Sequence, residues 1–467
     1  MSNSENLNPA GAAEVNRRDF LKGGSIATVM AMLGGVELVA EETNAPPAKA
    51  DSVLKKVKVA VIGLGGWGRE ILATFGQMSR INKVVTPEVA AICDTYPAFL
   101  RRSATVAPGA VQTQDYKTIL ENKDIPNVVV ATPTHQHKEI VLAALKAGKS
   151  VYCEAPLANT IEDAKAIASA AKASPQVVFQ AGLQMRSDKQ REFLLRFIRS
   201  GAIGKCVMAR AQWHKKQSWR AISPNPEREK ALNWRLYQST SLGLVGELGI
   251  HAIDQASLFL NAQPHAVTGF GAITLWNEDD RDVPDTNQVV FEFPGGVNMI
   301  YDATLGNSFD GEYEMLYGNN AAVMMRDGKA WMFKEVDSPL LGWEVYAAKQ
   351  TFYKDTGIAL VAGASKSTPL SEAETQEKAI TDAPLYVALQ RFLSNADDVR
   401  ASVERARSML GNDADPAVIA DQANATPRLP TAGCVEGFRA TVLAIKANEA
   451  VNSKQRVEWK PDIFELS

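Results

Sequence analysis

A glycine-rich hexapeptide is the clearest candidate for chemistry in this chain of 467 residues. It lies between an apolar run, Val57–Ile62, and a helical pattern, and its residues are Gly63, Leu64, Gly65, Gly66, Trp67 and Gly68. In this order Gly63 permits a tight turn, Gly65 lets the main chain approach a phosphate, and Gly68 lets the helix pack on the strand. Amides at the helix N-terminus would then face the anion. The motif predicts a dinucleotide site, and the alternative is a glycine-rich surface turn.

Asp94 follows the next expected strand, at the end of that strand where a ribose would lie. Its carboxylate would accept hydrogen bonds from the adenosine ribose hydroxyls and would repel a 2′-phosphate. NAD is therefore predicted in preference to NADP, although Arg101 and Arg102 follow closely enough to keep NADP open. The alternative for Asp94 is a turn or helix-capping aspartate.

Glu247 and His251 form a second candidate pair, four residues apart. On one helix this spacing puts both side chains on the same face, from which they could point together into a cleft. Imidazole suits a proton acceptor because its pKa lies near neutrality. Without further support, a buried, hydrogen-bonded structural histidine is the favoured interpretation of His251.

The elements that would position these residues begin as an α/β unit. Short β-rich runs alternate with helical patterns up to about residue 180, which predicts a doubly wound parallel sheet of the Rossmann type. The expected strands are Val57–Ile62, Val89–Cys93, Val128–Ala131, Ser150–Cys153 and Val177–Gln180.

Beyond Gly182 the pattern changes to a helix and then a succession of β-rich segments. Glycine-rich turns between them predict an α+β domain with a large, mostly antiparallel open sheet. A polar helical stretch at 372–412 leads to a last helix with an apolar stripe. The expected elements are the helix Lys189–Arg199 and the strands Val207–Trp213, Val267–Trp276, Gln288–Phe293 and Val297–Leu305.

The expected organisation has four parts. Residues 1–50 form a signal peptide and linker, and 51–182 form the nucleotide-binding Rossmann domain. Residues 183–430 form an α+β domain for substrate binding and oligomerisation. The C-terminal helix and tail, 431–467, are expected to pack back on the Rossmann domain.

The N-terminal segment resembles a twin-arginine export signal. Arg17 and Arg18 precede a weakly apolar stretch, 23–40, and Ala48-Lys49-Ala50 has the small-residue pattern of a cleavage site. The apolar stretch falls short of the roughly 20 residues that a membrane span needs, so no stable span is expected. A periplasmic or secreted protein is predicted; the alternative is a solvated arginine pair before a helix.

The composition excludes several classes of protein. Apolar residues make up 46% and charged residues 22%, which is typical of soluble globular domains. A net charge of -3 without a basic run argues against a nucleic-acid partner. No metal site is expected, because the cysteines lack metal-ligand spacing and are interpreted as small buried residues: Cys93, Cys153, Cys206 and Cys434.

Taken together, the motifs resemble the glucose-fructose oxidoreductase, inositol dehydrogenase and rhizopine-catabolism (Gfo/Idh/MocA) family over roughly residues 57–460. The motifs are the glycine loop, Thr132-Pro133 with His137, the helix end Ala144–Lys149, and Glu154-Ala155-Pro156. The resemblance implies an NAD-dependent oxidoreductase that acts on a sugar or polyol, with His251 as the proton acceptor. Glu247, where the family usually has aspartate, would orient the imidazole.

The resemblance also assigns binding roles. It implies that further cofactor contacts come from Thr132, Pro133, His137, Glu154 and Gln184. Substrate contacts would come from Arg186, Trp213 and Tyr237, although Arg186 could instead form a salt bridge at the domain linker and the aromatic residues could be core. A homo-oligomer, dimer or tetramer, would form through the open sheet.

Ala155 departs from the family pattern, which has lysine between the glutamate and the proline. That lysine lies near the nicotinamide and helps to steer the proton, whereas alanine carries no charge and no hydrogen-bonding group. Lys215 or Lys216 could replace its charge. Three hypotheses therefore remain: a sugar or polyol oxidoreductase; a glycosidase or lyase that uses tightly bound NAD for transient sugar oxidation; and a non-catalytic NAD- or sugar-binding protein.

Overall fold

The structure is a computed structural model. It describes residues 56–81, 84–345, 347–352, 355–361, 371–411 and 415–466. The expected export signal and linker, residues 1–50, lie outside the described residues.

Six parallel strands form the first sheet, in the order β3-β2-β1-β4-β5-β6. The order reverses between β1 and β4, and ligands of such sheets bind at the carboxyl ends of the strands beside this reversal. The expected doubly wound fold is confirmed, with one additional short strand, β3, whose residues are largely exposed. The strands are β1 (Lys56–Ile62), β2 (Thr86–Cys93), β3 (Val111–Thr113), β4 (Asn127–Val130), β5 (Ser150–Cys153) and β6 (Phe179–Ala181).

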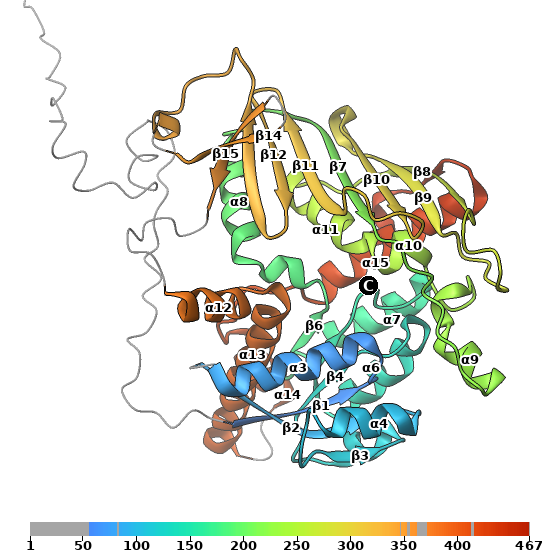
Figure 1. The fold of residues 1–467 in the computed structure, drawn as a ribbon. Coiled ribbons are helices and arrows are strands. Elements are labelled where there is room, and N and C mark those ends of the chain that lie inside the picture. Colours follow the sequence, from blue (N-terminus) through green and yellow to red (C-terminus); the bar gives the residue numbers. More distant parts are fainter. Residues whose placement is uncertain are drawn as a thin grey trace, which may run out of the picture.

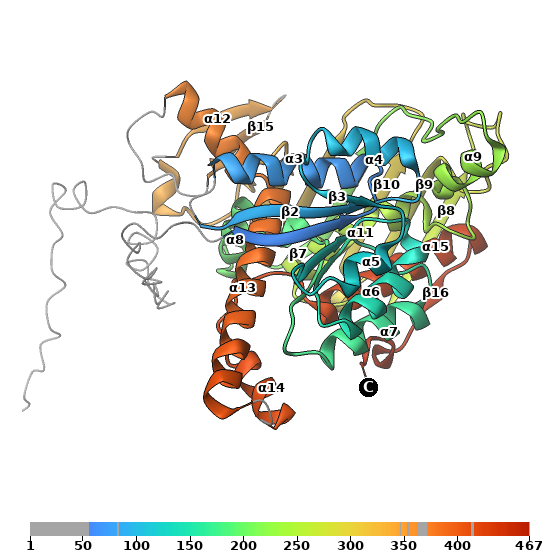
Figure 2. The ribbon, with the colours of Figure 1, turned by 90° about the horizontal axis from the view of Figure 1, so that it is seen from below.

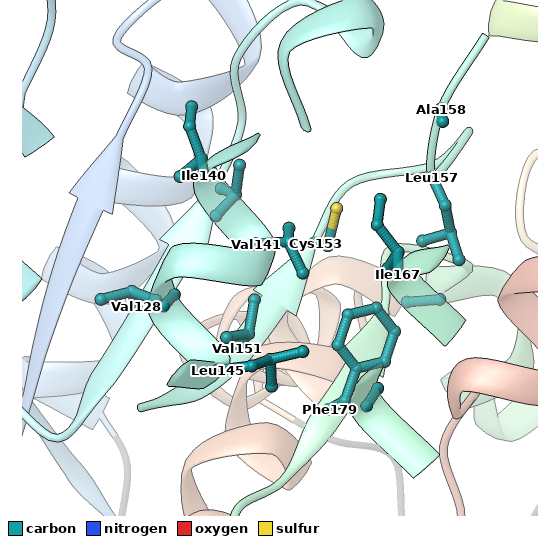
Figure 3. Packing of buried hydrophobic residues seen from close by; sticks show 14 of the residues in the cluster. Val128, Ile140, Val141, Leu145, Val151, Cys153, Leu157, Ala158, Ile167 and Phe179 are labelled. Atoms are coloured by element: carbon teal, nitrogen blue, oxygen red, sulfur yellow. The ribbon is translucent and has the colours of Figure 1, made fainter. Parts of the chain in front are cut away.

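Helices cover both faces of this sheet, as the alternation of side chains along β1 requires. Val59 and Val61 pack into a core with α3 and α13, whereas Ala60 and Ile62 pack into another with α6, α7 and α15. Figure 3 shows the second core, where Val128 and Val151 of the sheet meet Leu145 of α6. The helices are α3 (Gly66–Ile81), α4 (Pro97–Ala104), α5 (Tyr116–Glu121), α6 (His137–Lys146), α7 (Ile161–Lys172), α13 (Pro384–Leu410) and α15 (Cys434–Ser453).

Helix α13 packs on the Rossmann sheet, so its expected place in a second domain spanning 183–430 is wrong. The Phe392 ring lies 5.8 Å from the Tyr152 ring of β5, edge to face. Gln180 Nε2 of β6 donates to the Ala388 carbonyl at 3.0 Å. The polar composition of this stretch hid an apolar face with helical spacing that includes Leu385, Leu389 and Phe392. Figure 2 shows α13 crossing β1 and β2 near one end of these strands.

The second sheet has ten strands in the order β14-β15-β13-β12-β11-β7-β10-β9-β8-β16. Only β7 and β10 pair in parallel, so the expected mostly antiparallel sheet is confirmed. The strands are β7 (Cys206–His214), β8 (Ala266–Ala272), β9 (Thr286–Glu292), β10 (Asn298–Thr304), β11 (Glu312–Gly318), β12 (Ala321–Arg326), β13 (Lys329–Lys334), β14 (Lys349–Phe352), β15 (Asp355–Leu360) and β16 (Val457–Glu458).

Helices α10, α11 and α15 lie between this sheet and the Rossmann domain (Figure 1). Phe438 and Val442 of α15 belong to the Rossmann core, and Leu443 and Val451 of the same helix belong to the core of the second domain. The C-terminal helix therefore joins both domains. The remaining helices are α8 (Lys189–Arg199), α9 (Pro226–Leu232), α10 (Gly243–Glu247), α11 (Gly249–Leu260), α12 (Glu372–Thr381) and α14 (Pro416–Asn424), with 3₁₀ turns η1 (Thr134–Gln136), η2 (Gln184–Ser187), η3 (Trp234–Leu236), η4 (Pro294–Gly296), η5 (Gly342–Val345) and η6 (Pro461–Phe464).

The packing of α13 predicts a large effect of Phe392→Ala on stability. Removing this fully buried ring leaves a cavity against Tyr152, so the free energy of unfolding should fall by ~3–5 kcal/mol. Met409→Ala, at the exposed end of the same helix, should change it by less than ~0.5 kcal/mol. Urea unfolding followed by circular dichroism measures both variants, and equal midpoints would contradict this packing.

Candidate active site

The glycine loop has the shape of a phosphate cradle. Gly63 has φ +94°, and a Cβ atom there would lie 2.5 Å from the Ala131 carbonyl oxygen. A Cβ atom on Gly68 would lie 1.9 Å from the Gly63 oxygen, whereas Gly65 and Gly66 have no atom within 4 Å of that position. Helix α3 begins at Gly66, so the amides of its first turn lack intrahelical partners. A tight turn, open space and free amides thus meet at one point, as an anion site requires.

Asp94 braces this loop from the end of β2. Its Oδ2 accepts a hydrogen bond from the Leu64 amide at 2.8 Å, and its Oδ1 accepts one from the Tyr96 amide at 2.7 Å. The Arg228 guanidinium of α9 lies 4.0 Å from Asp94 Oδ1 and 4.0 Å from the centroid of the Tyr96 ring. Asp94 is thus a turn aspartate held beside the cradle, and the second domain brings a cation next to it that the sequence alone did not reveal.

A cavity of about 340 Å³ lies between the Rossmann domain and the second domain. The cavity brings together many of the residues that the sequence predicts for the site, and the structure places others away from it. The predicted residues that line it are Trp67, Thr132, His137, Glu154, Gln184, Trp213, Glu247 and His251. Pro133 does not line the cavity itself, although its neighbours Thr132 and Thr134 do.

Glu247 and His251 share the cavity but not one continuous helix, which corrects the expected geometry. Glu247 ends α10 and His251 lies in α11, with Leu248 between them at φ -115° and ψ -48°. Glu247 Oε2 accepts from Thr134 Oγ1 at 2.9 Å, and Oε1 accepts from the Leu242 amide at 3.1 Å. The carboxylate therefore joins the two domains and does not hold the imidazole in place. Burial raises the pKa of Glu247.

His251 presents an unprotonated imidazole to the cavity. Its Nδ1 is buried and has no hydrogen-bond partner. Burial lowers the pKa of His251 to about 4, and the positive charge of Arg191 acts in the same direction. The neutral ring is thus the dominant form at neutral pH, which is the form that accepts a proton.

Glu154 is a buried acid at the end of β5. Burial raises the pKa of Glu154 to about 8, and this outweighs the opposing effect of the hydrogen bond from Trp67. Because that pKa lies above neutrality, the carboxyl group is mostly protonated at pH 7. Its neighbour Ala155 also lines the cavity and adds no polar group.

His137 acts as a brace between two loops. Its Nδ1 lies 3.0 Å from the Pro156 carbonyl oxygen, and its Nε2 lies 2.9 Å from the Thr132 carbonyl oxygen. Burial lowers the pKa of His137 to about 4. The neutral ring carries one N–H and donates it to one of these two carbonyl oxygens, so the side chain ties α6 to the main chain beside the cavity.

The residues present fit an NAD molecule. Several residues that line the cavity have a buried polar atom without a hydrogen-bond partner in the described part of the chain, a state that normally costs free energy. A nicotinamide carboxamide, a ribose or a sugar hydroxyl would satisfy them. These atoms are Thr132 Oγ1, Glu154 Oε1, Gln184 Oε1 and His251 Nδ1.

Two predicted substrate residues lie elsewhere. Arg186 forms a two-fold ion pair with Asp254, from Nε to Oδ2 and from Nη2 to Oδ1, each at 2.8 Å. The Tyr237 hydroxyl donates to Asp280 Oδ1 at 2.9 Å. Neither residue lines the cavity, so both assignments as substrate contacts remain predictions that the cavity does not support. Their partners are distant in sequence and could not be found from spacing.

Several cavity residues were not assigned to the site from the sequence. Glu312 and Glu314 lie two residues apart on β11, so both side chains are on the same face of the sheet. This spacing of two acids on a strand could have identified them from the sequence. Arg235 reaches the cavity from η3, beside Trp234, and only the fold reveals it. Arg235 is the cation here, whereas the two lysines considered as substitutes, Lys215 and Lys216, are exposed outside the cavity.

The cleft continues beyond this cavity. A neighbouring cavity of about 610 Å³, between α8, β11 and α12, shares Met185, Glu312 and Glu314 with the first. The two together offer more room than one sugar ring needs beside a nicotinamide.

Neither a membrane-spanning helix nor a metal site occurs among the described residues. No helix there is both long enough and apolar enough to cross a membrane. In the same part of the chain, no three His, Cys, Asp or Glu side chains are grouped so as to hold a metal ion. The four cysteines are free thiols.

Comparison with protein families gives two adjoining matches. Residues 57–182 match the family described as "Oxidoreductase family, NAD-binding Rossmann fold", and residues 193–324 match "GFO/IDH/MocA C-terminal domain". The first covers the six-stranded sheet and the second begins the ten-stranded one.

Individual relatives are similar over part of their length. A levoglucosan dehydrogenase of Pseudarthrobacter phenanthrenivorans is 30% identical over 206 residues, 44% of this chain and 51% of the relative. An inositol 2-dehydrogenase of Salmonella typhimurium is 30% identical over 249 residues, 53% of this chain and 66% of the relative. An alpha-N-acetylgalactosaminidase of Shewanella oneidensis is 23% identical over 263 residues, 53% of this chain and 55% of the relative. The chain thus spans about half to two thirds of these relatives.

One solved structure shares the fold over nearly its whole length. It is a levoglucosan dehydrogenase in complex with NADH and levoglucosan, at TM-score 0.65 and 19% sequence identity. The alignment covers 86% of this chain and 99% of that one.

The cradle predicts opposite outcomes for two neighbouring glycines. Gly68→Ala would drive α3 away from Gly63, so NAD should bind at least about tenfold more weakly. Gly66→Ala meets open space and should change the affinity by less than about threefold. Calorimetric titration with NAD measures both, with thermal unfolding as a check on the fold. A folded Gly68→Ala protein that binds NAD as tightly as the wild type would contradict the cradle.

Proposed function

Because the chain belongs to the Gfo/Idh/MocA oxidoreductase family, we propose that it oxidises a sugar, polyol or sugar derivative with NAD in the cleft between its domains. The observation that carries this proposal is the cavity that neutral His251, whose Nδ1 is buried without a partner among the described residues, lines together with Thr132 and Gln184. The cavity lies beside the carboxyl ends of β4 and β5, where a nicotinamide belongs in this fold.

The residues that line the cavity have defined parts in this reaction. NAD, when bound, supplies the carbon that accepts a hydride from the substrate. His251 accepts the proton of the reacting hydroxyl, so that a carbonyl forms as the hydride leaves. Protonated His251 is disfavoured by burial and by Arg191, and the proton therefore passes on readily. Glu154, still protonated, donates a hydrogen bond into the cleft, and Thr132 and Gln184 orient the cofactor.

The role of His251 predicts both the rate and the pH profile. His251→Ala should lower kcat by at least about 100-fold while leaving NAD binding intact. In the wild type, kcat/KM should rise with pH through about 4, where His251 loses its proton, and be flat towards neutrality. NADH absorbance follows turnover, and His265→Ala, an exposed histidine outside the cavity, is the control. Wild-type turnover by His251→Ala would contradict the assignment.

A second candidate function is glycoside cleavage with NAD that stays bound and is reduced only transiently. Ala155 offers no group to steer a proton at the position of the family lysine. The additional cavity of about 610 Å³ offers space for the part of a glycoside beyond the oxidised ring. A relative named as a glycosidase supports this candidate as well.

The two candidates differ in what happens to the nucleotide. The oxidoreductase forms NADH in proportion to the sugar consumed, whereas the glycosidase releases a cleaved sugar without accumulating NADH. Mass spectrometry for retained nucleotide, followed by a screen of polyols, free sugars and glycosides, measures both. Stoichiometric NADH release would exclude the glycosidase.

Export through the twin-arginine route is part of the proposal, supported by Arg17 and Arg18 before the weakly apolar segment 23–40. That route carries folded proteins, so NAD would be loaded in the cytoplasm before export. Changing both arginines to lysine should retain the protein in the cytoplasmic fraction. Unchanged export of this double variant would disprove the signal.

A homo-oligomer formed through the open face of the ten-stranded sheet is also proposed. Phe270 of β8 leaves a large apolar surface exposed there, 56%. Light scattering of the purified protein measures the mass, and a monomer at micromolar concentration would refute this part of the proposal.

A further inference from the structure

Arg235 places a positive charge in the wall of the cavity that contains His251. The side chain is exposed and lines the cavity, and the surrounding protein lowers its pKa. An arginine remains charged nonetheless, because its pKa starts above 12. The guanidinium carbon lies 4.3 Å from the centroid of the Trp234 ring, which holds the group in place by a cation–π contact.

No hydrogen bond or ion pair within the described part of the chain satisfies this guanidinium. The acid that interacts with it electrostatically is Glu247. Both Glu247 oxygens already accept hydrogen bonds, one from Thr134 and the other from Leu242 and Ser241. Glu247 is therefore tied to other donors and leaves the donors of Arg235 free.

Two other arginines nearby behave differently. Arg191 binds Glu314 at 2.5 Å and lies 3.7 Å from Asp188, and Arg186 is paired with Asp254. Burying a charge without a partner is costly, so these pairs are the normal state of arginines inside a protein. Arg235 differs from both, because it is exposed to the cavity and has no such pair among the described residues, so its donors are free for an anion that enters the cleft.

The acids of the cavity do not neutralise Arg235. Burial raises the pKa of Glu154 to about 8, and it raises the pKa of Glu247 and Glu312 as well. Glu314 is neutralised by Arg191. The cavity is therefore less negative than its four glutamates suggest, and an anion can approach Arg235.

We propose that Arg235 binds a carboxylate on the substrate, so that the sugar oxidised or cleaved here is an acidic one, such as a uronic acid. The planar fork of a guanidinium matches a carboxylate with two parallel hydrogen bonds, and stacking on Trp234 fixes the plane of that fork. The cofactor phosphates have their own anion site at the start of α3. The choice of a sugar as the ligand rests on the proposed function.

Calorimetric titration of the NAD-saturated protein with matched sugars tests this assignment. D-Glucuronate is compared with D-glucose, and D-galacturonate with D-galactose. The wild type should bind at least one acid about tenfold or more tightly than its neutral parent, since charge-assisted pairs contribute this much. Arg235→Gln should abolish the preference and leave NAD affinity unchanged, whereas Arg235→Lys should retain part of it. Lys215→Gln, an exposed cation outside the cavity, should match the wild type.

Three results would overturn the assignment. The first is an acid preference that is unchanged in Arg235→Gln, and the second is a loss of NAD binding, rather than of acid binding, in that variant. The third is a wild-type protein that binds no acid of the panel more tightly than its neutral parent at millimolar concentration. Failure of the oxidoreductase proposal looks different. In that case the acid still binds through Arg235, but the bound nicotinamide is never reduced and no sugar is converted.

Discussion

The hydrogen bond from Thr134 to the buried carboxylate of Glu247 determines the geometry of the cleft. It crosses from the Rossmann domain to the end of α10, at the point where the chain turns into α11 and His251. A buried acceptor that loses its donor costs about 1–3 kcal/mol, so this contact resists opening of the cleft. Helix α15 acts in the same direction, because its side chains belong to both hydrophobic cores. The position of His251 in the wall of the cavity follows from both.

Burial controls the protonation of the site more than ion pairing does. Glu154 keeps its proton to about pH 8 and His251 loses its proton above about pH 4, because both side chains are removed from water. At neutral pH the site thus holds a neutral donor and a neutral acceptor. Ala155 adds nothing to this set, and Arg235 is the charged group without a partner. This distribution explains how a cleft lined with glutamates can still receive a proton from a substrate and attract an anion.

Features that depend on neighbouring residues in the chain could be predicted, and those that depend on distant partners could not. The spacing of Gly63 and Gly68 predicts the close approach of α3 to the loop after β1. The alternation of side chains along β1 predicts a strand that is covered on both faces. The sequence spacing of Glu247 and His251 placed both in one site, but it could not show the break at Leu248. The ion pair of Arg186 could not be assigned to Asp254 from the sequence, because this partner lies 68 residues away. Arg235 reaches the cavity only through the path of the loop before α10, which no periodicity reports.

The central claim is that hydride passes between a sugar carbon and NAD in this cleft, whether the net reaction is oxidation or cleavage. The direct measurement is isotopic. The NAD-loaded protein is mixed with carbon-deuterated sugars and glycosides, including uronic acids, and quenched with base, and the nucleotide is examined by mass spectrometry. Deuterium should appear in the reduced nicotinamide within a single turnover. Conversion of the sugar with no deuterium ever reaching the nucleotide would contradict the account.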